Sequence, residues 1–168
     1  MARSWMAAGL LAAWPGPALA APGSIGVSAT GTGSVTATVL APIVVTHTPG
    51  AALKFGKFTV GAGGAVVVSP AGSASVTGGV ALVLGSSSAA DGFLVEGDPN
   101  RGFAILTAAG SVSFAGVSLA FTTVPSAATG NLNAAGAASF TIGGTLSVPA
   151  NVAPGSYTGT YSVTVNYN

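Results

Sequence analysis

The chain has 168 residues, of which 49% are hydrophobic and only 4% are charged, and it contains 26 glycines, 10 prolines and no cysteine. A typical globular domain is about 25% charged. The near absence of charge therefore excludes nucleic-acid binders, which need a basic face for the phosphates, and highly charged disordered chains. A composition built from Gly, Ala, Val, Ser and Thr disfavours long helices and favours β-structure.

Residues 1–20 have the pattern of a secretory signal peptide. Arg3 gives a positive start, residues 5–14 are mostly apolar, and the Ala-Leu-Ala of residues 18–20 supplies a cleavage site. Because the apolar stretch is too short for a permanent transmembrane helix, we expect cleavage near Ala20 and no membrane span in the mature chain. The expected destination is the periplasm in transit, and then the cell surface or the medium. Because the sequence contains no cysteine, we expect neither a lipoprotein anchor nor disulfides in the mature domain.

Residues 21–35 form an N-terminal extension before the expected domain at 36–168. From residue 25 to residue 39 every odd position is apolar or glycine, which is the alternation of a strand with one buried face. A flexible Gly/Ser/Thr linker needs no such phase. We therefore predict a donor strand that fills the open sheet edge of another molecule by β-strand addition, or that folds onto its own sheet. Its groove-facing residues are predicted to be Ile25, Val27, Ala29, Gly31, Gly33 and Val35.

Short apolar runs separated by turn residues continue through the domain. They lie around residues 39–45, 53–60, 66–68, 76–84, 93–95, 103–106 and 112–121. The apolar phase changes at Gly56 and at Gly116, where a turn or a bulge would restore the facing. No segment after residue 20 has a helical period of 3.6 residues.

The clearest alternation lies in residues 138–148 and 157–168, with Gly143 and Gly144 expected as a bend. We predict that the apolar residues Phe140, Ile142, Val163 and Val165 are buried. The polar residues Thr141, Thr164 and Asn166 are predicted to be exposed. Such strands indicate an all-β fold, an antiparallel β-sandwich. An outer-membrane barrel is the competing interpretation, which the aromatic content of 7% disfavours.

Several motifs resemble those of secreted pilins. The segment 154–167, Pro-Gly-Ser-Tyr-Thr-Gly-Thr-Tyr-Ser-Val-Thr-Val-Asn-Tyr, resembles the ending of bacterial fimbrial subunits, and Leu-Lys-Phe-Gly-Lys-Phe at 53–58 resembles a segment of spore coat U-type pilin proteins. With residues 41–43, 93–97 and 142–150, the chain resembles the secreted bacterial family called domain of unknown function 4402. The resemblance implies a pilin-like, immunoglobulin-like β-sandwich that associates with itself or with related subunits, with a periplasmic chaperone and an outer-membrane usher as further partners. Unlike many fimbrial subunits, this chain has no cysteine pair.

Residues able to carry chemistry are few. His47, the single histidine, lies between two threonines at an expected strand end, which favours a surface residue over a catalytic triad. Asp91, Glu96 and Asp98 are the clustered acids, but their spacing fits no calcium motif, and Arg101 beside them favours a solvated turn. We expect neither an enzyme nor a cofactor or metal site. The expected function is a structural subunit of a pilus-like surface assembly, and the alternative is a monomeric secreted binding or adhesion module.

Overall fold

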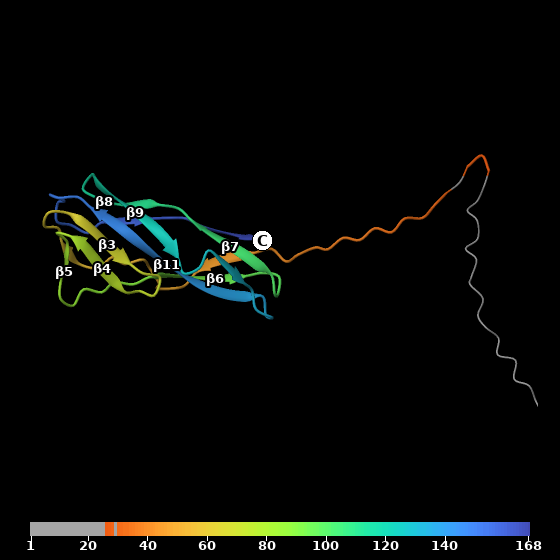
Figure 1. Ribbon diagram of the computed structural model, residues 1–168, viewed down its shortest axis with the longest axis horizontal. Helices are drawn as coiled ribbons and strands as arrows, with labels where there is room; N and C mark the ends of the chain where they lie inside the picture. The colour runs from red at the N-terminus through yellow and green to blue at the C-terminus, as the bar shows by residue number, and fades with distance from the viewer. Residues whose placement is uncertain (1–25, 29) are drawn as a thin grey trace, which may run out of the picture. The chain divides into compact units, whose positions relative to one another are not determined.

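The computed structural model describes residues 26–28 and 30–168 (Figure 1), and the chain divides after Thr38 into two units. In the first unit, residues 30–38 form no strand, and the side chains of Val27 and Val35 are fully exposed. The predicted signal peptide at 1–20 and the predicted donor residues Ile25 and Ala29 lie outside the described residues. The donor strand therefore stays a prediction.

The second unit, Val39–Asn168, is all-β, and every strand pairing in it is antiparallel. Its strands are β1 (Val44–His47), β2 (Phe58–Thr59), β3 (Gly64–Val68), β4 (Ala74–Gly78), β5 (Ala81–Leu82), β6 (Asp91–Glu96), β7 (Gly102–Thr107), β8 (Gly110–Phe114), β9 (Val117–Pro125), β10 (Thr129–Asn131), β11 (Ala137–Val148), β12 (Thr158–Thr160) and β13 (Val163–Tyr167). Over residues 26–28 and 30–168 no helix is long and apolar enough to cross a membrane.

The long strand β11 organises the sheets (Figure 1). One of its edges pairs with β6 in the first half and with β3 in the second half, and its other edge pairs with β9. The main sheet then extends to β1 beyond β6, to β8 and β12 beyond β9, and to β4 beyond β3. A three-stranded sheet, β10-β7-β13, and the pair β2-β5 complete an antiparallel, curled arrangement that is β-sandwich-like.

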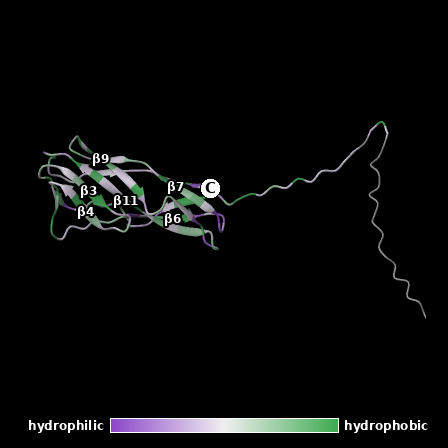
Figure 2. Cartoon of the chain, in the orientation of Figure 1, coloured by the Kyte–Doolittle hydropathy of each residue, from purple (hydrophilic) through white to green (hydrophobic). Residues whose placement is uncertain are grey.

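Two apolar clusters form the core of this unit. The first contains Val95, Phe103, Ile105, Leu132, Phe140, Ile142 and Val165, and the second contains Val66, Val80, Leu119, Phe121, Leu146 and Val148. Tyr161 packs against both clusters, so it lies at their boundary. Hydrophilic residues gather in the loops at the end of the unit where the C-terminus lies (Figure 2).

The predicted facing of the C-terminal half is confirmed. Phe140, Ile142 and Val165 are buried and Val163 is half-buried, whereas Thr141, Thr164 and Asn166 are exposed. The turn expected at Gly116 is confirmed between β8 and β9, whereas Gly56 lies in an irregular segment before β2, with a φ angle of +81°.

β11 continues through Gly143 and Gly144, where a bend was expected, and the pairing of its edge passes from β6 to β3 at these residues. A Cβ at Gly143 would collide with the carbonyl oxygen of Val68, and one at Gly144 would collide with that of Thr122. These glycines therefore permit close approach by neighbouring chain segments, which is the other common reason for glycine inside a strand.

Candidate functional site

β12 and β13 follow one another across Tyr161 and Ser162, which belong to neither strand; we call residues 158–167 together the C-terminal strand, and one of its edges is unpaired. β12 pairs with β8 and β13 pairs with β7, and the two ladders follow one another on the same side with an offset of one residue near Tyr161. Among the described residues no strand pairs with the opposite edge, and β1 likewise pairs only with β6. Unpaired edges present rows of backbone N–H and C=O groups that can accept a further strand.

The free edges of β1 and of the C-terminal strand border a common gap, which we call the groove. At one end the Tyr167 hydroxyl donates a hydrogen bond of 2.8 Å to the carbonyl oxygen of Ala41, and β1 approaches β13. Farther along, Leu53 and Phe55 share a pocket with Gly159 on the C-terminal strand. The open part of the groove therefore lies between residues 47–55 on one wall and residues 159–161 on the other, and the contact between Tyr167 and Ala41 closes one end.

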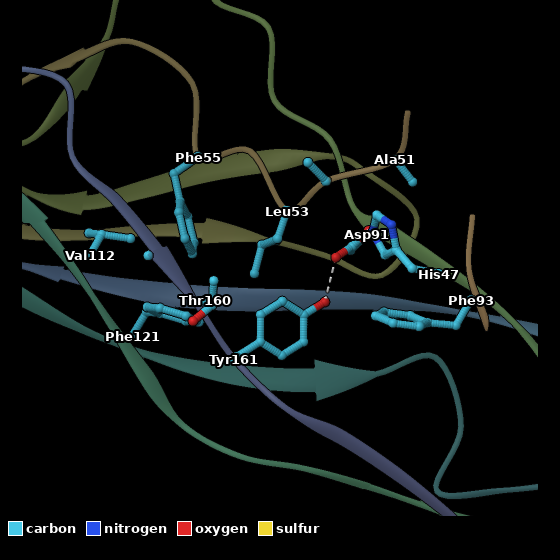
Figure 3. Close-up of a pocket in the computed structure, with 12 residues that line it drawn as sticks. His47, Ala51, Leu53, Phe55, Asp91, Phe93, Val112, Phe121, Thr160 and Tyr161 are labelled. Carbon is cyan, nitrogen blue, oxygen red and sulfur yellow. Dashed lines mark hydrogen bonds and ion pairs between the residues drawn. The ribbon is translucent and has the colours of Figure 1, made fainter. Parts of the chain in front are cut away.

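The groove opens into a pocket of about 390 Å³ with a largely apolar lining (Figure 3). Leu53, Phe55, Val112 and Phe121 surround one part of it, and the rings of Phe55 and Phe121 meet edge to face at 6.0 Å between centroids. Gly144 of β11 lets Leu53 and Phe55 lie directly on the sheet, since a Cβ there would contact both side chains. The result is an apolar hollow beside an unpaired strand edge.

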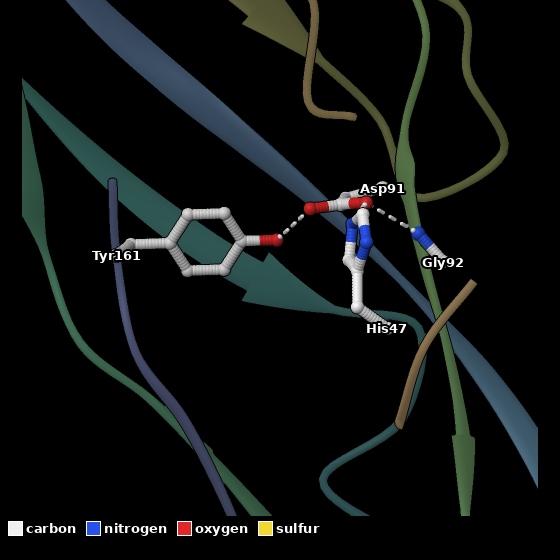
Figure 4. Close-up of polar contacts among 4 residues, drawn as sticks. All are labelled: His47, Asp91, Gly92 and Tyr161. Carbon is white, nitrogen blue, oxygen red and sulfur yellow. Dashed lines mark hydrogen bonds and ion pairs between the residues drawn. The ribbon is translucent and has the colours of Figure 1, made fainter. Parts of the chain in front are cut away.

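A buried carboxylate connects the two walls beneath the pocket. Asp91, at the start of β6, is only 5% exposed. Its Oδ1 accepts hydrogen bonds from Nε2 of His47 at 2.7 Å and from the backbone N–H of Gly92 at 2.9 Å, and its Oδ2 accepts one from the Tyr161 hydroxyl at 2.7 Å (Figure 4). Because a carboxylate only accepts, Nε2 of His47 must carry the proton. We call His47, Asp91 and Tyr161 the clamp, since they join β1, β6 and the C-terminal strand.

Tyr161 stands beside the pocket as a fixed aromatic ridge (Figure 3). Its ring lies edge-on to Phe93 at 6.4 Å and to Phe121 at 6.1 Å between centroids. Burial raises the pKa of the Tyr161 phenol far above its ordinary value of 10.0, and the hydrogen bond to Asp91 and the charge of that carboxylate add to the rise. The hydroxyl therefore remains protonated and continues to donate to Asp91.

The structure separates the acids that the sequence groups together. Asp91 belongs to the clamp, whereas Glu96 is exposed at the other end of β6. Asp98 forms an ion pair of 3.0 Å with Arg101, as a solvated turn predicts. In the part of the chain that the structure describes, no group of three or more His, Cys, Asp or Glu residues could hold a metal ion.

His47 differs from the simple surface residue that the sequence suggests. Its side chain is 48% exposed, but Nε2 is engaged by the buried Asp91 carboxylate, and its ring lies edge-on to Phe93 at 5.2 Å. The arrangement is suited to holding two chain segments at a fixed separation.

The predicted donor residues that the structure describes contact nothing that would fix their position. Val27 and Val35 are fully exposed, and a Cβ added at Gly31 or Gly33 would have no neighbour within 4 Å. The sequence analysis predicted a donor segment but did not locate the groove. The walls of the groove lie far apart in the chain, and only the fold brings them together.

A family model described as Domain of unknown function (DUF4402) matches residues 43–167. The matched region contains β1 to β13 and both walls of the groove, and the N-terminal extension precedes it. No curated protein and no solved structure matches the chain.

Proposed function

The chain belongs to the family Domain of unknown function (DUF4402), and we propose that it is a non-enzymatic structural subunit of a pilus-like or other cell-surface assembly, joined by β-strand addition. The extension at 21–35 of one subunit enters the groove of the next. The domain is then an immunoglobulin-like, pilin-like sandwich that receives one strand from its neighbour. Export by the signal at 1–20 brings the subunits to the surface, with a periplasmic chaperone and an outer-membrane usher as candidate partners.

The groove is the observation that carries this proposal. It combines two unpaired strand edges, on β1 and on the C-terminal strand, with an apolar hollow of about 390 Å³ between them. A strand placed there would gain ladder hydrogen bonds from its backbone and bury alternate side chains, which is how β-strand addition produces affinity and specificity. The occupant must therefore be extended, with apolar residues at every second position.

The N-terminal extension meets this requirement. Its odd positions are apolar or glycine, its even positions from Ser24 on are Ser or Thr apart from Gly26, and Val27 and Val35 are fully exposed in the single chain. Burial of one such β-branched side chain contributes about 1.5–3 kcal/mol. An exposed alternating segment and an unfilled groove in one chain favour exchange between copies of that chain.

Two adjacent substitutions test the proposal. Val35→Asp would place an unpaired carboxylate in the apolar groove, so the variant should remain a monomer by light scattering. Ser34→Asp adds the same charge on the opposite face and should assemble like the unmodified protein. Equal behaviour of both variants, or an unmodified protein that stays monomeric at every concentration, would contradict strand addition and favour the monomeric binding or adhesion module.

A further inference from the structure

We propose that the inserted strand runs antiparallel to the C-terminal strand, with Gly33 opposite Tyr161 and Val35 opposite Gly159, in a register set by the clamp. This inference rests on the proposed function and specifies how its groove recognises the strand. The occupant is a second copy of this chain, and the recognition element is the alternation of small and large residues along the two edges.

Gly159, Thr160 and Tyr161 all line the pocket, with a hollow beside Gly159 and the Tyr161 ring two residues further along. Gly159 contributes no side chain and lines the pocket that Leu53, Phe55 and Phe121 surround. Two residues later the Tyr161 ring projects inward and is fixed by its 2.7 Å hydrogen bond to Asp91. A strand that lies on this wall must provide a side chain opposite Gly159 and leave space opposite Tyr161.

The extension provides this pattern in one orientation. Residues directly opposite in an antiparallel pair share a face and have Cβ atoms about 4.5–5.5 Å apart. With Gly33 opposite Tyr161, the ring meets no side chain, and Val35 falls opposite Gly159 and fills the hollow. If the strand is shifted by two residues so that Gly33 lies opposite Gly159, neither residue has a side chain and the hollow stays empty.

The direction of the strand also decides whether the assembly can grow. In the antiparallel orientation the residues after Val35 leave the groove past Gly159, away from the end where Ala41 of the acceptor is bonded to Tyr167. Each added subunit then continues an open, head-to-tail series. In the parallel orientation the residues after Val35 would leave the groove at the Ala41 end, where two copies could exchange strands and close into a dimer. With a glycine of the extension opposite Tyr161 in that orientation, Ala29 or Gly31 would face the hollow.

Paired cysteines in the full exported protein test the register, because the native chain contains no cysteine. Ser34 and Thr160 are exposed in the single chain and are directly opposite in the proposed register. The variant Ser34→Cys/Thr160→Cys should give a ladder of covalent multimers on a non-reducing gel after mild oxidation, and reduction should collapse it. Directly opposed residues have the Cα separation of about 4.4–6.8 Å that a disulfide needs.

Two control pairs contain the same number of thiols at exposed positions. Ser34→Cys/Thr164→Cys places the partner four residues away, about 13 Å along the strand, and should give no ladder. Ser34→Cys/Thr158→Cys reports the register shifted by two residues and should also give none. Light scattering before oxidation identifies which of the three variants assemble, and the gels of those variants are compared.

The outcomes separate the register from the function. A ladder from either control pair, or no ladder from any pair in proteins that assemble, would overturn the register while strand addition stands. A fast-migrating oxidised monomer from Ser34→Cys/Thr160→Cys would show insertion into the same chain and overturn exchange between copies. An unmodified protein that never assembles would overturn the proposed function, and the register with it.

Discussion

The Tyr161 hydroxyl donates a 2.7 Å hydrogen bond to Oδ2 of Asp91, a residue 70 positions earlier in the chain. Asp91 is buried at the start of β6, and its Oδ1 is occupied by His47 and the Gly92 amide. Hydrogen bonds to a buried charged group are among the stronger polar contacts in proteins. This contact fixes the position of the C-terminal strand relative to the opposite wall of the groove.

Loss of the Tyr161 hydroxyl should destabilise the domain. Tyr161→Phe keeps the ring but leaves Oδ2 of a buried carboxylate without its donor, so the free energy of unfolding should fall by about 1.5–3 kcal/mol. Tyr157→Phe is the matched control, because that hydroxyl bonds the exposed carbonyl of Ala153 and its loss should cost well under half as much. Equal losses in urea unfolding would show that the clamp has no special energetic role.

High pH should weaken the domain through the same tyrosine. Burial raises the folded-state pKa of Tyr161 above its ordinary 10.0, so the stabilisation is fully present below about pH 10 and is lost as the pH rises and the unfolded chain ionises. The stability difference between the unmodified protein and Tyr161→Phe should therefore shrink above that pH. Urea unfolding of both proteins across this range measures it, and a difference that stays constant or grows would contradict the cause given for the shift.

The facing of β11 gives a third prediction. Phe140 is buried in the first core cluster and stacks on Phe93 at 5.5 Å between centroids, whereas Thr141 is exposed. Phe140→Ala should lower the free energy of unfolding by about 3–5 kcal/mol through lost burial and the cavity left behind. Thr141→Ala should change it by less than about 0.5 kcal/mol. Similar losses at both positions would mean that the strand faces the other way.

The strands were predictable where the signal is local. A period of two residues is encoded in neighbouring positions, so the faces of β11 and of the C-terminal strand follow from the sequence. The clamp was not predictable, because His47 and Asp91 are 44 residues apart and their contact depends on the pairing of β1 with β6. Gly143 shows a different limit, since a glycine inside a strand signals a bend and a close approach equally well.

The small residues of the extension should be required for assembly. Gly33→Val would add a branched side chain where the Tyr161 ring occupies the groove, so the fraction of protein in assemblies should fall at least tenfold by light scattering. Thr32→Val is the control, since it places the same side chain on the opposite face and should assemble normally. Normal assembly of Gly33→Val would exclude a crowded position opposite Gly33.

Binding of the isolated extension tests strand capture most directly. The acceptor is the full-length Val35→Asp protein, which keeps the groove but cannot donate its own strand, and the probe is a labelled synthetic peptide of residues 22–38. Fluorescence anisotropy should show saturable binding of the native peptide and at least tenfold weaker binding of the peptide with Gly33→Val. Absence of binding, or equal binding of both peptides, would contradict the groove as the acceptor of the strand.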